Sequence, residues 1–356
     1  MTTRNDLLDA ARRATEVIAD FHLKDRINDG YTRIDPALLA SMAEVTVMYK
    51  SLDKLLGGFL REGDSPGILV NVARPRGLIH MTCAHELGHY FLGHESSADE
   101  TVDFGTHADI KERQANHFAY SLLAPQWLVA SIMRLKGWTR TDLEVPSVVY
   151  QLSLRLGTSY TATVWSLVRC KLLQHSAADS LLSQPPKGLK QSLLDGRTLS
   201  DANADVWQLD ISDRDRILEP GYGDLFVLDL PNHAGSGHLW SVDELSSEGF
   251  TLRPFVRDAR IHSRQQNSEH PVGGGKSTIR YLLETPESFE RSESESDERS
   301  RPAQRRQLIS MQEKSPWSTS PSRIDRFSVS AEFEQMRGGL STAEKDLRLA
   351  TVRDMK

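Results

Sequence analysis

The fold of this protein is decided by the stretch Ala84-His85-Glu86-Leu87-Gly88-His89-Tyr90, taken together with Lys111-Glu112-Arg113-Gln114-Ala115-Asn116. The first segment contains the pattern His-Glu-x-x-His. On a helix, this spacing places His85 and His89 one turn apart on the same face, where both imidazoles can reach one metal ion. Glu86, beside the first histidine, can then hold a water molecule at that ion. The second segment offers the carboxylate of Glu112 as a third ligand.

The chemistry of zinc suits this set of residues. Zinc prefers a tetrahedral shell of nitrogen, oxygen or sulfur ligands, and a catalytic site keeps one of the four positions for water. Two histidines and one carboxylate leave that position open. The ion lowers the pKa of the water and polarises a carbonyl group, while Glu86 takes the water's proton and later delivers it to the leaving amine. The pattern therefore predicts a zinc-dependent peptidase.

The surroundings of the histidine pair favour a buried, rigid helix. Gly88 costs a helix about 1 kcal/mol relative to alanine. A small residue at this position is understandable if another element of the fold passes close by. The apolar neighbours of the pair in the sequence are Met81, Cys83, Ala84, Leu87, Phe91 and Leu92.

The third ligand has two candidates, and the spacing favours Glu112. Asn116 follows Glu112 at i+4, on the same helix face, and could bind the outer nitrogen of a ligand histidine, which fixes the tautomer and orientation of the ring. His94 is the alternative. The metzincin pattern places a glycine and a histidine three and six residues after the second histidine, but Leu92 and Glu95 occupy these positions.

The sequence leaves the group that stabilises the oxyanion open. Tyr90, His94 and His107 lie nearby, and each is interpreted first as a packing or loop residue. The two cysteines, Cys83 and Cys170, imply no disulfide framework.

Composition and charge favour a soluble, cytoplasmic protein. The chain has 356 residues, of which 38% are hydrophobic and 26% charged. Its net charge of −6 gives no electrostatic reason to expect direct binding of nucleic acid. The first residues lack the apolar core of a secretory signal, and no run has the roughly 18 apolar residues of a membrane helix, so no membrane partner is expected. The oligomeric state is left open.

The periodicity predicts an α+β protein. Residues 1–175 are expected to form the zinc peptidase domain, mainly helical, with strands at 45–49 and 67–72. Between them, residues 52–60 are expected to hold a short helix that leads into a strand. Residues 148–173 have the pattern of a helix-turn-helix. Because Arg169 and Lys171 are the only cations of its second helix, a structural hairpin is favoured over DNA binding.

The second half of the chain has a different pattern. We expect a linker at 176–205, an all-β sandwich at 206–335 with a disordered insert at about 287–306, and a charged tail at 336–356. Gly273-Gly274-Gly275-Lys276-Ser277 is not a phosphate loop, because His270 stands where the first glycine of such a loop is required.

The segment Cys83 to His94, followed by Glu112-x-x-Ala115-Asn116 and the residues up to Pro125, resembles the ImmA/IrrE family of metallo-endopeptidases over roughly residues 30–170. The resemblance implies a zincin-like, gluzincin-type fold with His85, His89 and Glu112 as zinc ligands and Glu86 as the catalytic acid/base. It also implies a helix-turn-helix repressor of a mobile element or stress regulon, a transcriptional repressor, as the protein substrate. The chain departs from the familiar form at Ala124, where methionine is common.

The second half also carries a resemblance. Residues 228–240 resemble an inhibitory loop of chagasin-type cysteine-peptidase inhibitors, and 272–275 and 315–317 fall where that immunoglobulin-like fold has its other loops. A recognition or docking role is expected for this domain. The alternative for the whole chain is a catalytically latent protein-binding module in which the β domain captures a partner, but the intact Glu86 argues against it.

Overall fold

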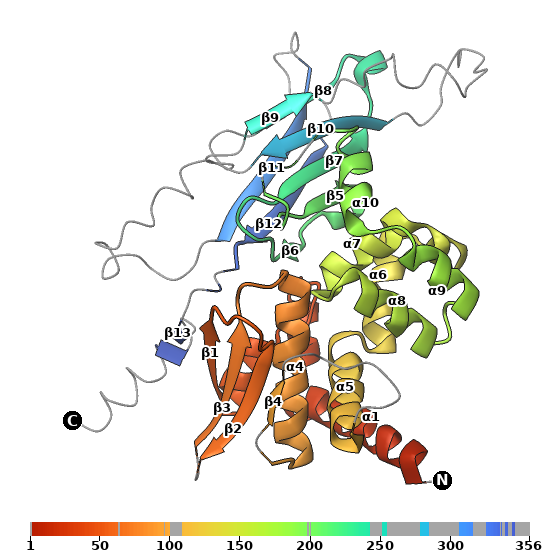
Figure 1. The fold of residues 1–356 in the computed structure, drawn as a ribbon. Helices are drawn as coiled ribbons and strands as arrows, with labels where there is room; N and C mark the ends of the chain where they lie inside the picture. The colour runs from red at the N-terminus through yellow and green to blue at the C-terminus, as the bar shows by residue number, and fades with distance from the viewer. Residues whose placement is uncertain are drawn as a thin grey trace. The chain divides into compact units, whose positions relative to one another are not determined.

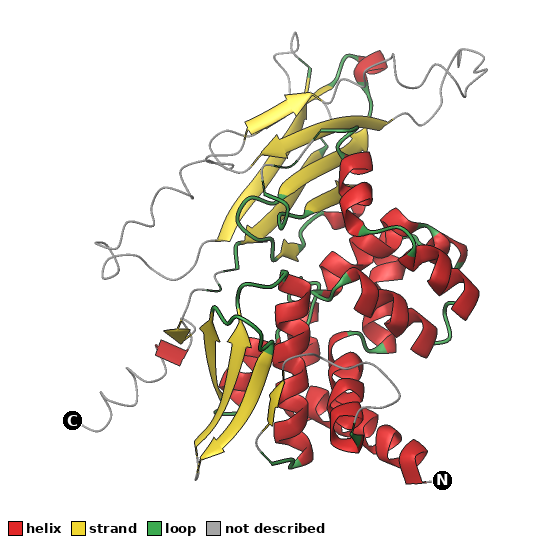
Figure 2. Cartoon of the chain, in the orientation of Figure 1, coloured by secondary structure: helices red, strands yellow, loops and turns green. Residues whose placement is uncertain are grey.

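The computed structural model describes residues 2–62, 65–95, 97–99, 109–197, 199, 201–242, 251–254, 278–284, 306–315, 325–334, 336, 339–340 and 344–345. The chain divides into two compact units, one of residues 1–184 with 335–356 and one of residues 185–334. Helices predominate in the first unit and strands in the second (Figures 1 and 2). The protein is therefore α+β, as the periodicity predicts. Among the described helices, none has the length and apolar character needed to cross a membrane.

The first unit contains a five-stranded sheet with the order β13-β1-β3-β2-β4. β1 is parallel to β3, and the other neighbours are antiparallel. Its strands are β1 (Thr46–Lys50), β2 (Gly57–Glu62), β3 (Ser65–Asn71), β4 (Ser97–Asp99) and β13 (Gly339–Leu340).

Helices cover this sheet and extend beyond it (Figure 1). α4 packs on β2 and β3, and α5 packs between α4 and α1. The helices of this unit are α1 (Thr2–Asp20), α2 (Leu23–Asn28), α3 (Pro36–Met42), α4 (Arg76–Leu92), α5 (Ile110–Leu123), α6 (Gln126–Lys136), α7 (Pro146–Leu156), α8 (Tyr160–Arg169) and α9 (His175–Leu182).

The central helix, α4, is buried over most of its length. Every residue from Ile79 to Gly88 is buried, including the polar ones. The helix ends at Gly93, which has a φ of 72° in the left-handed region that glycine enters without strain. A helix buried on all sides holds its side chains in fixed positions, which a metal site requires.

Four expectations from the sequence differ from the structure. Residues 52–60 were expected to hold a short helix that leads into a strand. The strand is present, since β2 begins at Gly57 and pairs with β3, but the helix before it is absent. Residues 4–27, where the apolar spacing predicts a single helix, form two helices, since the chain bends at His22. Residues 176–205, expected as a linker, contain α9 and α10 (Pro186–Leu193). The expected tail contributes β13 to the first unit, where Glu344 accepts a hydrogen bond from the backbone N–H of Val47.

The second unit contains two four-stranded sheets, β5-β7-β10-β9 and β6-β12-β11-β8. Their neighbours are antiparallel except for β5 with β7 and β6 with β12. Trp240 on β8 donates a hydrogen bond to the carbonyl oxygen of Pro231 on β7, which joins the two sheets at 2.8 Å. The strands are β5 (Val206–Asp210), β6 (Ile217–Leu218), β7 (Leu225–Pro231), β8 (Leu239–Val242), β9 (Thr251–Pro254), β10 (Thr278–Glu284), β11 (Arg306–Lys314) and β12 (Arg326–Glu332).

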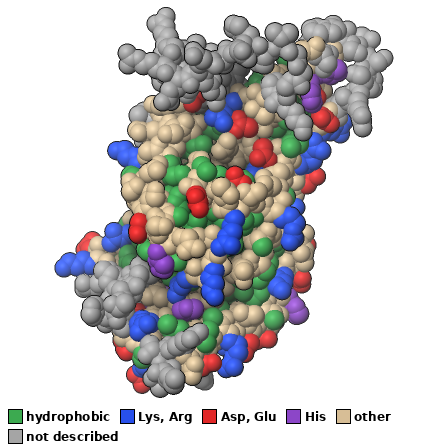
Figure 3. Space-filling model, turned by 90° about the vertical axis from the view of Figure 1, so that its right-hand side faces the viewer, with side chains coloured by type: hydrophobic (Ala, Val, Ile, Leu, Met, Phe, Trp, Pro, Cys, Tyr) green, Lys and Arg blue, Asp and Glu red, His purple; other side chains and the backbone are tan. Residues whose placement is uncertain are grey.

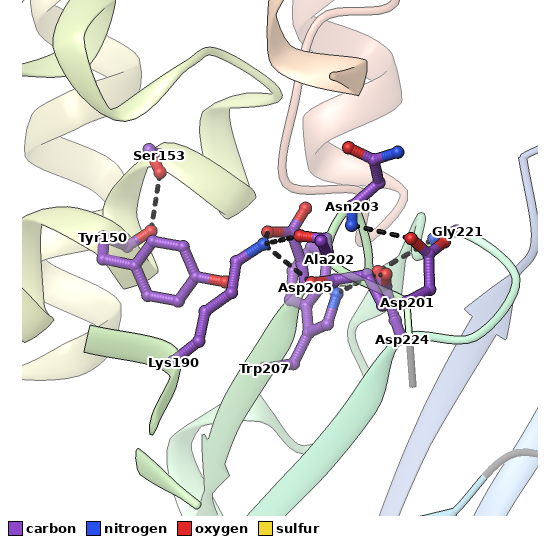
Figure 4. A network of polar contacts seen from close by, with 11 residues as sticks. Tyr150, Ser153, Lys190, Asp201, Ala202, Asn203, Asp205, Trp207, Gly221 and Asp224 are labelled. Atoms are coloured by element: carbon purple, nitrogen blue, oxygen red, sulfur yellow. Dashed lines mark hydrogen bonds and ion pairs between the residues drawn. The ribbon is translucent and has the colours of Figure 1, made fainter. Parts of the chain in front are cut away.

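A buried carboxylate ties the start of this unit together. Asp224 is 1% exposed and accepts hydrogen bonds from the indole of Trp207 and from the backbone N–H groups of Asp205 and Gly221 (Figure 4). Lys190 on α10 forms an ion pair with Asp205 at 3.1 Å. These contacts hold α10 and β5 on the second unit, which explains why the unit begins before the predicted β domain.

The surface drawn in Figure 3 carries basic and acidic side chains interspersed with each other. This mixture agrees with the modest net charge of −6. The expected insert at 287–306 lies outside the described residues except for Arg306, the first residue of β11.

Candidate metal centre

Helices α4 and α5 bring together the three residues that the sequence predicts to be metal ligands. His85 and His89 lie on α4, and Glu112 lies in the first turn of α5. The Nε2 atoms of the two histidines are 3.1 Å apart. One carboxylate oxygen of Glu112 lies 3.2 Å from Nε2 of His85, and the other lies 3.3 Å from Nε2 of His89. Two imidazole nitrogens and the two oxygens of one carboxylate therefore converge on one point.

The spacing of these atoms fits a tetrahedral zinc ion. With zinc–ligand distances of about 2.0–2.1 Å, two ligands of one tetrahedral ion lie about 3.3–3.4 Å apart. The three observed distances of 3.1, 3.2 and 3.3 Å are within 0.3 Å of this value. The histidines are buried, whereas the side chain of Glu112 is 24% exposed. Three ligand residues would leave the fourth position of a tetrahedral shell for water.

Gly88 allows the two helices to approach closely. A Cβ atom at Gly88 would lie 3.0 Å from both the Cα and the carbonyl oxygen of Ala115, and 3.3 Å from Cβ of Phe118. A side chain at this position would therefore push α5 away from α4. The structure confirms the expectation that another element passes close to this glycine, and the element is the helix that carries Glu112.

The outer nitrogens of both histidines have partners. Nδ1 of His85 donates to the side-chain oxygen of Asn116 at 3.0 Å, which leaves the lone pair of Nε2 directed toward Glu112. Nδ1 of His89 lies 3.1 Å from Nδ1 of His94. Burial lowers the pKa of His94, against a weaker opposing effect of its hydrogen bond with Gln114. A neutral His94 can accept the Nδ1 proton of His89.

Glu86 lies inside the protein beside the ligand pair. It is fully buried on α4, and its Oε1 atom would be 3.1 Å from a Cβ atom placed on Gly57. The same Cβ would overlap Cγ2 of Thr82 and lie 2.9 Å from the carbonyl oxygen of Leu69. The glycine at the start of β2 therefore leaves the space in which the Glu86 carboxylate lies. The sequence contained no clear signal of this role, because Gly57 follows a segment expected to be helical.

The other residues considered from the sequence have packing roles or lie outside the described residues. The Tyr90 hydroxyl donates weakly to the carbonyl oxygen of Ala43 at 3.5 Å, and its ring packs edge-on against Phe59. Burial, followed by the charge of Arg169, lowers the pKa of His117 to about 4. His107 lies outside the described residues.

His80 and Cys83 are two further buried residues of α4. A ring nitrogen of His80 donates to the carbonyl oxygen of Gly157 at 2.8 Å, so His80 joins α4 to the turn between α7 and α8. Cys83 is fully buried, as the sequence suggests. Both residues support the helix and stand outside the convergent group of ligands.

Sequence and structure comparisons place part of the chain among known proteins. A search of curated proteins found no match. The cysteine protease inhibitor EhICP2 from Entamoeba histolytica is similar at 12% identity and a TM-score of 0.24, over 38% of this chain and 100% of the inhibitor. Amebosin is similar at 16% identity and the same TM-score, over 37% of this chain and 98% of its own. Scores this low support no conclusion about the fold. Residues 40–163 match the IrrE N-terminal-like domain of the Peptidase_M78 family, and this match supports a metallopeptidase-type function.

Proposed function

We propose that the protein is a zinc-dependent endopeptidase that cleaves a specific protein substrate. The observation that carries this proposal is the convergence of His85, His89 and Glu112 at 3.1–3.3 Å, with Glu86 next to the first histidine. The match of residues 40–163 to a metallopeptidase family supports the same chemistry.

Each residue of the site has a distinct role in this proposal. His85, His89 and Glu112 would hold the zinc ion, which when bound acts as a Lewis acid toward the scissile carbonyl and toward water. Glu86 accepts a proton on its carboxylate during attack and returns it to the leaving nitrogen. Asn116 and His94 orient the two imidazoles.

The proposed substrate is a helix-turn-helix transcriptional repressor, and the proposed location is the cytoplasm. The support for this substrate is the resemblance of the motif to a family whose members cut such repressors. The second unit would recognise or dock the substrate, and direct contact with nucleic acid is not required. In the alternative of a latent binding module, the full chain would bind a partner and leave it intact.

Replacement of Glu86 by glutamine tests the proposal. The variant keeps the shape of the side chain but cannot accept the proton. We expect it to hold the same amount of zinc as the unaltered protein while cleavage of a cellular protein extract, followed by mass spectrometry of new peptide ends, falls to background. The exposed Glu95→Gln is the matched control and should cleave normally. Cleavage that persists in Glu86→Gln would refute the mechanism, and a protein without zinc would refute the site.

A further inference from the structure

A second group of metal-ligating side chains lies in the second unit, far along the chain from the first. His233 follows the end of β7, Glu313 lies on β11, and Asp325 directly precedes β12. One ligand atom from each of these side chains lies within 4.8 Å of the other two. Nothing in the sequence spacing indicates that these residues meet, because 80 residues separate His233 from Glu313.

Glu313 occupies a position that faces the interior. On β11, the buried residues alternate as Ile309, Met311 and Glu313, so the carboxylate continues a row of apolar side chains. It is 3% exposed. Burial, and to a smaller extent the negative charge of Glu313, raise the pKa of Tyr281 on β10 of the other sheet. A buried carboxylate requires a cation or several hydrogen-bond donors to offset its lost hydration.

Among the residues that the structure describes, the groups that contact Glu313 do not balance the two carboxylates of the cluster. Nδ1 of His233 lies 2.8 Å from one carboxylate oxygen and 3.0 Å from the other. A protonated His233 would supply one positive charge against the two negative charges of Glu313 and Asp325. In the described part of the chain, neither carboxylate forms an ion pair with a lysine or arginine. A divalent cation would balance both.

We propose that His233, Glu313 and Asp325 form a second binding site for a divalent cation of the zinc class. One imidazole nitrogen and two carboxylate oxygens are ligands that zinc accepts. The backbone supports the site, since the N–H of Glu313 donates to the carbonyl oxygen of Asp325 at 2.9 Å. The indole of Trp240 fixes the end of β7 through Pro231, two residues before His233.

The exposed His233 side chain can move to make room for the ion. Two ligands of a tetrahedral zinc lie about 3.3 Å apart, so the imidazole of His233 must move outward by roughly 0.5 Å from its contact with Glu313. Its side chain is 44% exposed and can make this movement, while the buried Glu313 stays in place. A cation bound here would link the ends of β7, β11 and β12 and so join both sheets. This role is structural and does not depend on peptidase activity.

Zinc stoichiometry of the full-length protein tests the proposal. We expect native mass spectrometry with added zinc to show two ions per chain, with one lost in His89→Ala, the other lost in His233→Ala, and both lost in the double variant. Asp325→Asn changes an exposed side chain and should also lose the second ion without affecting folding. His175→Ala, an exposed histidine outside both groups, is the control and should retain two.

Two results would overturn the second site. The first is a single ion that is lost in His89→Ala and kept in His233→Ala, which would leave the His233–Glu313 contact as an ion pair. The second is a second ion that persists in both His233→Ala and Asp325→Asn, which would place it elsewhere. Circular dichroism of each variant shows whether a loss of zinc reflects the ligand or the fold.

Discussion

Replacing Gly88 by alanine has two opposing effects on stability: a better helix former and a steric overlap with α5. In an unobstructed helix, this substitution stabilises by about 1 kcal/mol, because alanine is the better helix former. At Gly88, the new Cβ would lie 3.0 Å from two backbone atoms of Ala115, whereas ordinary contacts are 3.4–4 Å. Overpacking of this kind costs about 1–3 kcal/mol. We expect the metal-free protein to be destabilised by about 0–2 kcal/mol.

The movement of α5 that the new methyl group at position 88 requires should also weaken metal binding. α5 must move away from α4 by several tenths of an ångström, and Glu112 moves with it while His85 and His89 stay on α4. Zinc tolerates deviations of about 0.2 Å in its ligand distances. We therefore expect zinc affinity, measured by competition with a chelator, to fall by roughly tenfold or more, the range seen when the support of a ligand is disturbed.

Gly188 provides a matched control for this experiment. It lies in α10, and a Cβ added there meets no atom within 4 Å. Gly188→Ala should therefore stabilise the protein by up to about 1 kcal/mol in urea denaturation and leave zinc affinity unchanged. If Gly88→Ala gave the same gain in stability and the same zinc affinity as this control, the close approach of α4 and α5 would have no role in the site.

Three further perturbations follow from individual contacts. Asn116→Ala should lower zinc affinity about 10–100-fold, because the ring of His85 loses its hydrogen-bond acceptor. Asn116→Asp keeps an acceptor oxygen and should restore much of the affinity. If Asn116→Ala bound zinc as tightly as the unaltered protein, Asn116 would have no positioning role. Asp224→Ala leaves three N–H groups without their acceptor and should lower the free energy of unfolding by about 3 kcal/mol or more, whereas the exposed Asp201→Ala should cost less than about 1 kcal/mol. The pKa of His117 is lowered to about 4. Its contribution to the free energy of unfolding is therefore complete above about pH 6.5 and is lost as the pH falls toward 4. His117→Gln should make the free energy of unfolding less sensitive to acid over that interval, and an unchanged pH profile would contradict the lowered pKa.

The shared helix face of the two candidate ligand histidines was predictable because their spacing is a local property of a helix. The separation of His85 and His89 places both on one face of α4 whatever surrounds it. Glu112 was preferred over His94 for a similar reason, since the metzincin spacing fails at Leu92 and Glu95. The general division into a helical part and a strand-rich part follows from periodicity in the same way.

The remaining features depend on residues distant in the chain. Gly57 begins a strand because β3 offers it a partner, and its missing side chain leaves room for Glu86. The residues expected as a tail add β13 to the sheet through pairing with β1. His94 reaches the outer nitrogen of His89 only because α4 ends at Gly93 and turns the chain back.

The sequence by itself therefore determined that His85 and His89 share one helix face at the first candidate site, because helical periodicity acts over a few residues. Tertiary structure decided what surrounds that site: the contact of α5 with Gly88, the space at Gly57 and the strand from the far end of the chain. It also decided that His233, Glu313 and Asp325 meet. Such contacts join segments whose separation along the chain carries no periodic signal, so packing alone establishes them.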